Sequence, residues 1–255
     1  LWMVDFSPGP RLRTEDGCVL STHLSIIIDD HSRLIPYAAY YEKADTAAFL
    51  DTLKESLIRR GVPLKLYTDQ GGPYICQHTQ TVCANLNIRL LHAKPYHAWS
   101  KGKVERVIQT VQQGFESSLK LEGNQVHSLS ALNRKLSEWI QITYHQRLHS
   151  STHETPETRY HRAIANIRQL EVDPATLETL FYTRLTRRVR KDGTVRIDNV
   201  LFEVDLSLRS FKVELRFNPF TLERIEVWHQ DAFRGLANKV NLNLNSETGG
   251  STSYA

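Results

Sequence analysis

The first 121 residues alternate between strand-like and helix-like segments in an order that leaves few folds open. Three strand-like segments joined by short turns come first and predict an antiparallel meander. A helix, a strand, a helix and a strand then follow, which predicts a mixed sheet with helices on its faces and hence an α/β fold. The opening segments are residues 1–6, 19–29 and 34–41, and the later ones are 46–60, 64–68, 78–86 and 88–91.

Turn and cap signals mark where these segments end. Apolar residues recur at helical spacing over 46–60, with Asp45 or Thr46 suited to cap the start and Gly61 to end the helix. Pro8-Gly9-Pro10 is expected to break the first strand, because proline has no amide hydrogen to give to a ladder.

The chain changes character near Arg184. Before it, helical periodicity predicts long helices over 101–121 and 130–144, and Asp173-Pro174 suits the start of a short linker helix. After it, short alternating segments joined by Gly, Asn and Pro turns predict a small all-β barrel. We therefore expect a core at 1–165, a linker helix at 166–183, a barrel at 184–240 and a disordered tail at 241–255.

Composition argues against several classes of protein. Cys18, Cys76 and Cys83 include no CxxC pair, which argues against a disulfide framework or a thiolate zinc site and favours a reducing cytoplasm. No segment approaches the ~18 apolar residues of a membrane span. A net charge of +4 and a pI near 8.9 fit a polyanionic partner without requiring one. Strand-like sequence starts at Leu1 itself, so we expect that a natural N-terminal region is missing.

Three carboxylates fall where a metal site could form. Asp5 lies within an apolar strand, Asp69 just after a strand, and Glu105 near the start of a long helix. Brought together, they would repel one another unless cations neutralised them, and an acidic set of oxygen ligands suits Mg²⁺ or Mn²⁺. Two such ions can activate the attacking oxygen at a phosphodiester and stabilise the leaving one. Taken singly, each acid also fits a turn cap or a solvated helix residue.

The sequence around these acids resembles a known family. Positions 69 and 105 leave 35 residues between them, as in the D,D-35-E signature of retroviral integrases and insertion-sequence transposases. Four elements occur in the order of that family: IDDHSR at 28–33 resembles its D.xSR element, TDQG at 68–71 its (T/S)D.G element, KGKVER at 101–106 its (N/K)GxVER element, and YHQRLHSSTHETP at 144–156 its YNxxRPHxxLxxxTP tail.

The resemblance to the DDE transposase and integrase superfamily covers about residues 2–160 and implies an RNase H-like core, a five-stranded mixed sheet flanked by helices. It implies that Asp5, Asp69 and Glu105 are catalytic and hold two Mg²⁺ or Mn²⁺ ions. Water would attack the phosphodiester at the transposon end and free a 3′-OH, and that 3′-OH would then attack target DNA. The implied partners are end and target DNA and further copies of the chain in a synaptic complex, in the bacterial cytoplasm at the nucleoid and without a membrane.

Several residues are candidates for DNA contacts. One and two turns after its catalytic Glu the family has lysines, whereas this chain has Gln109 and Gln112. In the tail, Leu148 and Thr152 replace the usual Pro and Leu, which affects local packing. The C-terminal barrel resembles that of phage Mu-type transposases, and residues 184–196 hold six basic residues against one Asp. The residues expected to contact phosphates are Lys101, Lys103 and Arg106 in the core and Arg187, Arg188, Arg190 and Lys191 in the barrel.

Other polar residues have competing interpretations. Asp29 and Asp30 are expected to be structural, with Asp30 or His31 bonding Arg33, rather than metal ligands. Histidines four apart could share a helix face and bind zinc, but surface or supporting roles are favoured; these are His145, His149 and His153. His92 or His97 could orient a substrate, and Tyr96 and Trp99 beside Lys94 could stack on a base or pin a loop.

Three functions fit the whole sequence. The first is the recombinase described above. The second is a metal-dependent nuclease of the same fold that cleaves DNA but does not join it. The third is a non-catalytic DNA-binding regulator, and the presence of all three acids argues against it.

Overall fold

The computed structural model describes residues 1–93, 102–121 and 126–240. Lys94, Tyr96, His97, Trp99 and Lys101 therefore lie outside the described residues. The chain divides into two compact units, Leu1–Val172 and Asp173–Ala255. Among the described residues, no helix combines the length and the apolar composition needed to cross a membrane.

The first unit is built on a five-stranded sheet with the strand order β3-β2-β1-β4-β5. The first three strands pair antiparallel as a meander, and β4 and β5 join them in parallel. This confirms the expected mixed sheet. The strands are β1 (Trp2–Arg13), β2 (Val19–Asp29), β3 (Ala38–Tyr41), β4 (Lys65–Thr68) and β5 (Arg89–His92).

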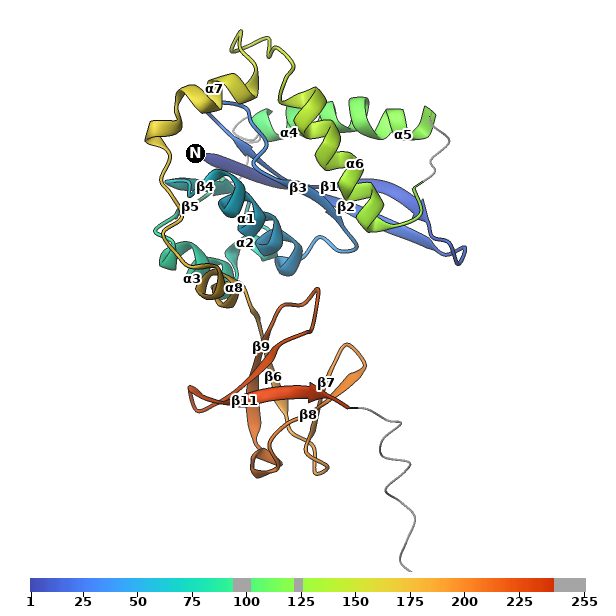
Figure 1. Ribbon diagram of the computed structural model, residues 1–255, viewed down its shortest axis with the longest axis vertical. Helices are drawn as coiled ribbons and strands as arrows, with labels where there is room; N and C mark the ends of the chain where they lie inside the picture. The colour runs from blue at the N-terminus through green and yellow to red at the C-terminus, as the bar shows by residue number, and fades with distance from the viewer. Residues whose placement is uncertain (94–101, 122–125, 241–255) are drawn as a thin grey trace, which may run out of the picture. The chain divides into compact units, whose positions relative to one another are not determined.

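Helices cover both faces of this sheet, so that Ile26, Ile27 and Ile28 in the middle of β2 are all fully buried. Figure 1 shows one group of helices on each side of the sheet. On one side lie α1 (Thr46–Arg60), α2 (Gly72–Ile75) and α3 (Gln77–Asn85), and on the other lie α4 (Gly102–Val111), α5 (Ser117–Leu121) and α6 (Leu129–Trp139). Asp45 caps α1 as predicted, accepting from the amide of Ala48.

The two long helices predicted after position 101 each contain a π-helical turn. Gln112–Glu116 joins α4 to α5, and Ile140–Tyr144 continues α6. The first of these turns is closely packed, because a Cβ atom at Gly114 would lie 2.7 Å from the ring of Trp139. The periodicity of 3.6 does not reveal such turns, since each adds one residue to a helix that otherwise continues.

Pro8-Gly9-Pro10 does not end the first strand, so that expectation was wrong. β1 continues to Arg13, with its register against β2 shifting between Pro8 and Arg11. Such an irregularity tolerates residues that give no hydrogen to the ladder. Thr22 Oγ1 donates to the carbonyl of Pro10 at 2.7 Å, and a Cβ at Gly9 would lie 2.5 Å from that same Oγ1.

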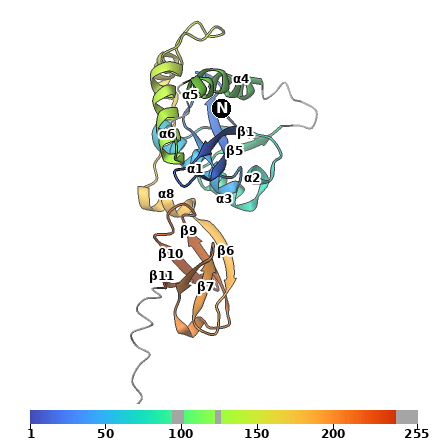
Figure 2. The same cartoon turned by 90° about the vertical axis from the view of Figure 1, so that its right-hand side faces the viewer.

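The second unit begins with α8 (Pro174–Leu180), capped by Asp173 as predicted, and continues as a six-stranded antiparallel sheet. Its strand order is β6-β9-β10-β11-β8-β7, and the two edge strands approach each other: Arg187 Nε on β6 donates to the carbonyl of Arg196 on β7 at 3.3 Å. The nearly closed sheet (Figure 2) confirms the expected barrel. Its strands are β6 (Thr183–Arg188), β7 (Thr194–Ile197), β8 (Val200–Glu203), β9 (Lys212–Phe217), β10 (Ile225–His229) and β11 (Ala232–Lys239), of which β6 and β11 were not predicted.

A buried histidine ties the end of α6 to the loop between β2 and β3. The amide of Ile35 donates to His145 Nε2 at 3.2 Å, and His145 Nδ1 lies 3.4 Å from Glu157 Oε2 on α7 (Pro156–Arg162). Burial lowers the pKa of His145 to about 4, although Glu157 acts in the opposite direction. Because its Nε2 accepts a hydrogen bond, the folded protein needs this ring neutral.

We predict that the free energy of unfolding falls as the pH decreases from 6.5 towards 4. The unfolded chain binds a proton at His145 in that window and the folded chain does not, which costs about 1 kcal/mol per pH unit. Urea unfolding of His145→Gln at pH 7, 6 and 5 should show a flatter pH dependence than the parent chain. The exposed His31→Gln should behave like the parent, and an unchanged slope in His145→Gln would contradict this account.

Candidate active site

Asp5 lies on β1, and Asp69 directly follows the neighbouring strand β4. Met3 on β1 pairs with Tyr67 on β4, and each acid comes two residues further along its chain. Met3 and Tyr67 pack into the core on the α4 side of the sheet. Since side chains alternate along a strand, Asp5 faces this side too. The parallel register therefore brings both acids to one stretch of the sheet.

The turn after β4 is shaped around the Asp69 carboxylate. The amide of Gly71 donates to Asp69 Oδ1 at 2.7 Å, and a Cβ atom at Gly71 would lie 2.8 Å from that oxygen. Thr68 Oγ1 donates to the carbonyl of Asp69 at 2.8 Å and lies 2.9 Å from Nδ1 of His92. His92, a candidate for substrate orientation, thus supports the end of β4.

A buried tyrosine, Tyr74, follows the turn that holds Asp69. The ring of Tyr74, on α2, packs against Phe6 and Phe49 at centroid distances of 6.1 and 4.9 Å. Burial raises the pKa of Tyr74 most, and the charges of Asp5 and Asp69 raise it further. Within the described parts of the chain, the Tyr74 hydroxyl has no hydrogen-bond partner.

Helix α4 runs in the same direction as β1. Lys103, in its first turn, pairs at 2.5 Å with Asp30, whose amide donates to the carbonyl of Leu1 at the start of the sheet. Two turns past Glu105, Gln112 Nε2 donates to Ser7 Oγ on β1 at 3.0 Å. Val104, Val107, Ile108 and Val111 pack α4 onto the core between these contacts.

Glu105 lies between these two contacts on α4, with its side chain exposed. The structure thus places all three acids along the same part of β1. Over residues 1–93, 102–121 and 126–240 it nevertheless gathers no three His, Cys, Asp or Glu side chains into a group that could hold a metal ion.

Comparison with known proteins bears on what this arrangement is. The family model described as the TnsB C-terminal domain matches residues 37–120, and that described as Mu transposase, C-terminal, matches residues 178–234. The chain is 27% identical over 243 residues to the transposase for transposon Tn552 of Staphylococcus aureus, covering 86% of this chain and 49% of the relative. It is 30% identical over 144 residues to the transposase for insertion sequence IS1202 of Streptococcus pneumoniae, covering 52% of this chain and 30% of the relative.

These similarities support a place for the chain in the DDE transposase and integrase superfamily. Its fold is also that of a solved chain in the simian T-cell lymphotropic virus intasome in complex with PP2A regulatory subunit B56 gamma, with a TM-score of 0.53 at 16% identity, covering 94% of this chain and 78% of that one. The chain spans about half the length of the Tn552 relative and less than a third of the IS1202 relative.

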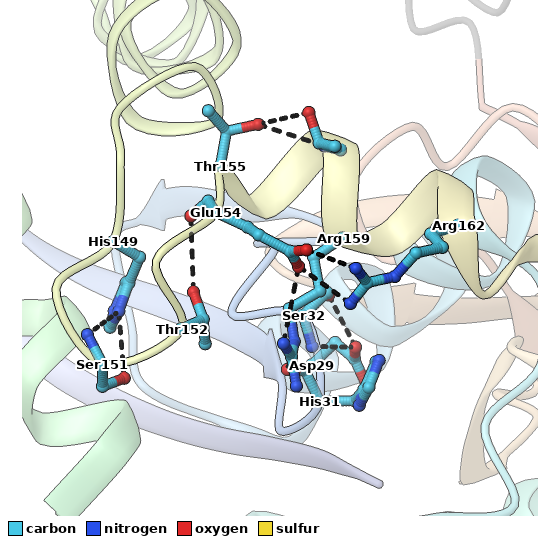
Figure 3. Close-up of polar contacts among 11 residues, drawn as sticks. Asp29, His31, Ser32, His149, Ser151, Thr152, Glu154, Thr155, Arg159 and Arg162 are labelled. Carbon is cyan, nitrogen blue, oxygen red and sulfur yellow. Dashed lines mark hydrogen bonds and ion pairs between the residues drawn. The ribbon is translucent and has the colours of Figure 1, made fainter.

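Two further family elements have structural roles. In the D.xSR element, the amide and hydroxyl of Ser32 donate to Asp29 Oδ2 at 2.9 and 2.6 Å, and Arg33 pairs with Asp30 at 3.7 Å, as expected for Asp30. The side chain of Arg159 donates to the carbonyl of His31 at 2.8 Å (Figure 3). Through these contacts, Asp29 and Asp30 each have a partner within the protein.

The family tail at 144–156 forms a loop closed on itself. The amide of His149 donates to the carbonyl of Glu154 at 3.0 Å, and the Glu154 carboxylate pairs with Arg159 and Arg162 (Figure 3). Ser151 Oγ lies 3.1 Å from His149 Nδ1. The three histidines of this segment do not converge: His145 bonds Ile35, His149 bonds Ser151, and His153 is exposed.

The residues expected to contact DNA are exposed wherever the structure describes them. Lys101 lies outside the described residues, Lys103 pairs with Asp30, and Arg106 Nη1 lies 3.5 Å from Gln109. In the barrel, Arg187 bonds the carbonyl of Arg196, and Arg190 lies 3.7 Å from Asp192. Arg188 and Lys191 also lie on the surface. Their roles remain predictions.

The buried hydroxyl of Tyr74 leads to a prediction about stability. Tyr74→Phe should leave the free energy of unfolding unchanged or raise it by up to about 1 kcal/mol, because it removes a buried donor that has no acceptor among the described residues. Tyr40→Phe is the matched control: it removes the 2.8 Å bond to Glu116 Oε1 and should cost about 1–2 kcal/mol. Equal losses in urea titrations of the two variants would show that Tyr74 has a partner in solution.

Proposed function

We propose that the chain carries the catalytic core of a DNA transposase, which cuts transposon ends and joins the freed 3′-OH to target DNA. The observation that supports this most directly is the register of β1 and β4, which aligns Asp5 with Asp69 in a member of the superfamily. The position of α4 along β1 adds Glu105 to the same stretch.

The donor set fits divalent metal ions. Asp5 and Asp69 supply hard oxygen ligands, and two carboxylates aligned by the register of β1 and β4 would repel each other unless a cation lay between them. In this proposal Asp5, Asp69 and Glu105 hold two Mg²⁺ or Mn²⁺ ions. When bound, the ions would supply Lewis acidity at the scissile phosphodiester.

The chain's own residues have distinct tasks in this proposal. Gly71 and its amide keep the Asp69 carboxylate in one orientation. The α4 cations Lys103 and Arg106 position the DNA backbone without reading sequence. The basic residues of the barrel extend this contact; they are Arg187, Arg188, Arg190 and Lys191.

The same proposal extends to the assembly. Joining two transposon ends to one target requires at least two copies of the chain in a synaptic complex, acting on DNA at the bacterial nucleoid. A nuclease of the same fold that cuts without joining is the nearest alternative, because it would use the same three acids.

Asp69→Asn should abolish joining of a precut end with a free 3′-OH to a target duplex, by on the order of a hundredfold or more, because a metal ligand is lost. DNA affinity in EDTA should stay within about twofold of the parent value, since the fold and the cations are unchanged. The exposed Asp16→Asn, in the turn between β1 and β2, is the matched control and should keep full activity. Joining by Asp69→Asn at the parent rate would refute the recombinase, and cleavage without any joined product in the parent chain would favour the nuclease.

Adjacent glycines give a finer test of the Asp69 geometry. Gly71→Ala should reduce joining at least tenfold, because the added Cβ would lie only 2.8 Å from Asp69 Oδ1 and would push that oxygen out of position. A Cβ at Gly72, in contrast, would meet nothing within 4 Å. Gly72→Ala should therefore retain parent activity. Gel assays of strand transfer at equal folded-protein concentration distinguish the two variants, and equal activities would show that the orientation of Asp69 does not matter.

A further inference from the structure

A groove of about 610 Å³ lies between the first two turns of α4 and the loop that follows Tyr144. Among the described residues, its walls include four side chains with a permanent positive charge and no carboxylate. The cations come from three separate parts of the chain: Arg33 after β2, Lys103 and Arg106 on α4, and Arg147 in the loop. This convergence does not follow from any charged run in the sequence.

The positive charge in this groove is only partly compensated. Asp30 pairs with Arg33 at 3.7 Å and with Lys103 at 2.5 Å, so one carboxylate faces two cations. Arg106 and Arg147 are exposed, and no ion pair involves either of them within the described residues. His149, on the same wall, has its pKa lowered by burial and then by the charges of Arg33 and Arg147. The groove therefore has a positive potential.

One of these cations is prepared for a ligand. Arg33 Nη1, the atom that lies 3.7 Å from Asp30, is buried and has no partner at hydrogen-bond distance in the part of the chain that the structure describes. The backbone of Arg33 is fixed in the left-handed region at φ 68°, with its amide donating to Asp29 and its carbonyl accepting from Tyr144 Oη at 2.9 Å. A buried donor held in place in this way favours an anionic acceptor.

The groove and Glu105 lie on different flanks of α4. Residues advance by about 100° around a helix axis, so Lys103, Arg106 and Thr110 gather on one flank and Glu105, Gln109 and Gln112 on the other. The buried stripe of valines and Ile108 separates the two flanks on the inner side. With a helix diameter of about 10 Å, a ligand in the groove would not occupy the position of a ligand at Glu105.

We propose that this groove binds phosphate groups of a duplex DNA backbone, so that α4 contacts DNA on both of its flanks. The inference rests on the proposed function for the identity of the anion. An open groove with spread cations and the hydroxyls of Thr110, Ser150 and Ser151 suits an extended polyanion that is held without base recognition. It adds Arg33 and Arg147 to the residues that hold DNA.

The test is the salt dependence of binding to a duplex of arbitrary sequence, measured by fluorescence anisotropy in EDTA. The double variant Arg106→Gln/Arg147→Gln should reduce the slope of log K against log salt by about 1–2, as expected for two lost phosphate contacts, and should weaken binding at least tenfold at low salt. Arg13→Gln/Arg134→Gln removes two exposed charges elsewhere in the first unit and should have at most a twofold effect. Equal losses in the two double variants, or none in the first, would overturn the proposal.

A second arm identifies the anion. Inorganic pyrophosphate at matched ionic strength should displace the duplex no better than chloride does, and displacement at micromolar concentration would reassign the groove to a small phosphorylated ligand. Because both arms omit metal and joining, they stand apart from the test of the active site. If Asp69→Asn joined ends normally while Arg106→Gln/Arg147→Gln lost binding, the recombinase would fail and the groove would remain.

Discussion

The parallel pairing of β1 with β4 is the contact on which the site depends. It aligns Met3 with Tyr67, and through them Asp5 with Asp69, although 63 residues separate the acids in sequence. A shift of one residue in this register would turn one acid to the other face of the sheet. The register is held by side chains buried on both faces of the central strands, so the core of the unit stabilises the site directly.

Helix α4 depends on the same core and distributes charge around it. Its apolar stripe is buried against β1 and β2, which leaves the acid on one flank and most of the cations on another. The separation has an electrostatic reason, since cations beside Glu105 would pair with it and reduce its value as a ligand. The ion pair with Asp30 holds the Lys103 side chain near the start of β1. Gln112, where the family has a lysine, makes an uncharged hydrogen bond to Ser7 instead.

Local signals predicted much of the fold. The caps at Asp45 and Asp173, the periodicity of α1 and the order of strands and helices were sufficient for the mixed sheet and for the barrel. Pro8-Gly9-Pro10 misled the prediction, because Thr22 and a register shift compensate for the missing amides from another strand. α7 is short, and β6 and β11 depend in part on pairing with β9 and β8, which do not adjoin them in sequence.

The sequence by itself established the resemblance to the transposase and integrase family, through four motifs in order and the 35-residue interval between Asp69 and Glu105. It also predicted which acids would hold a metal, because chemical identity and spacing are properties of the chain alone. Only the tertiary structure decided that strand register aligns Asp5 with Asp69, and that Arg33 and Arg147 line a groove with α4. These proximities arise from strand register and helix rotation, which long-range packing sets and which no local pattern encodes.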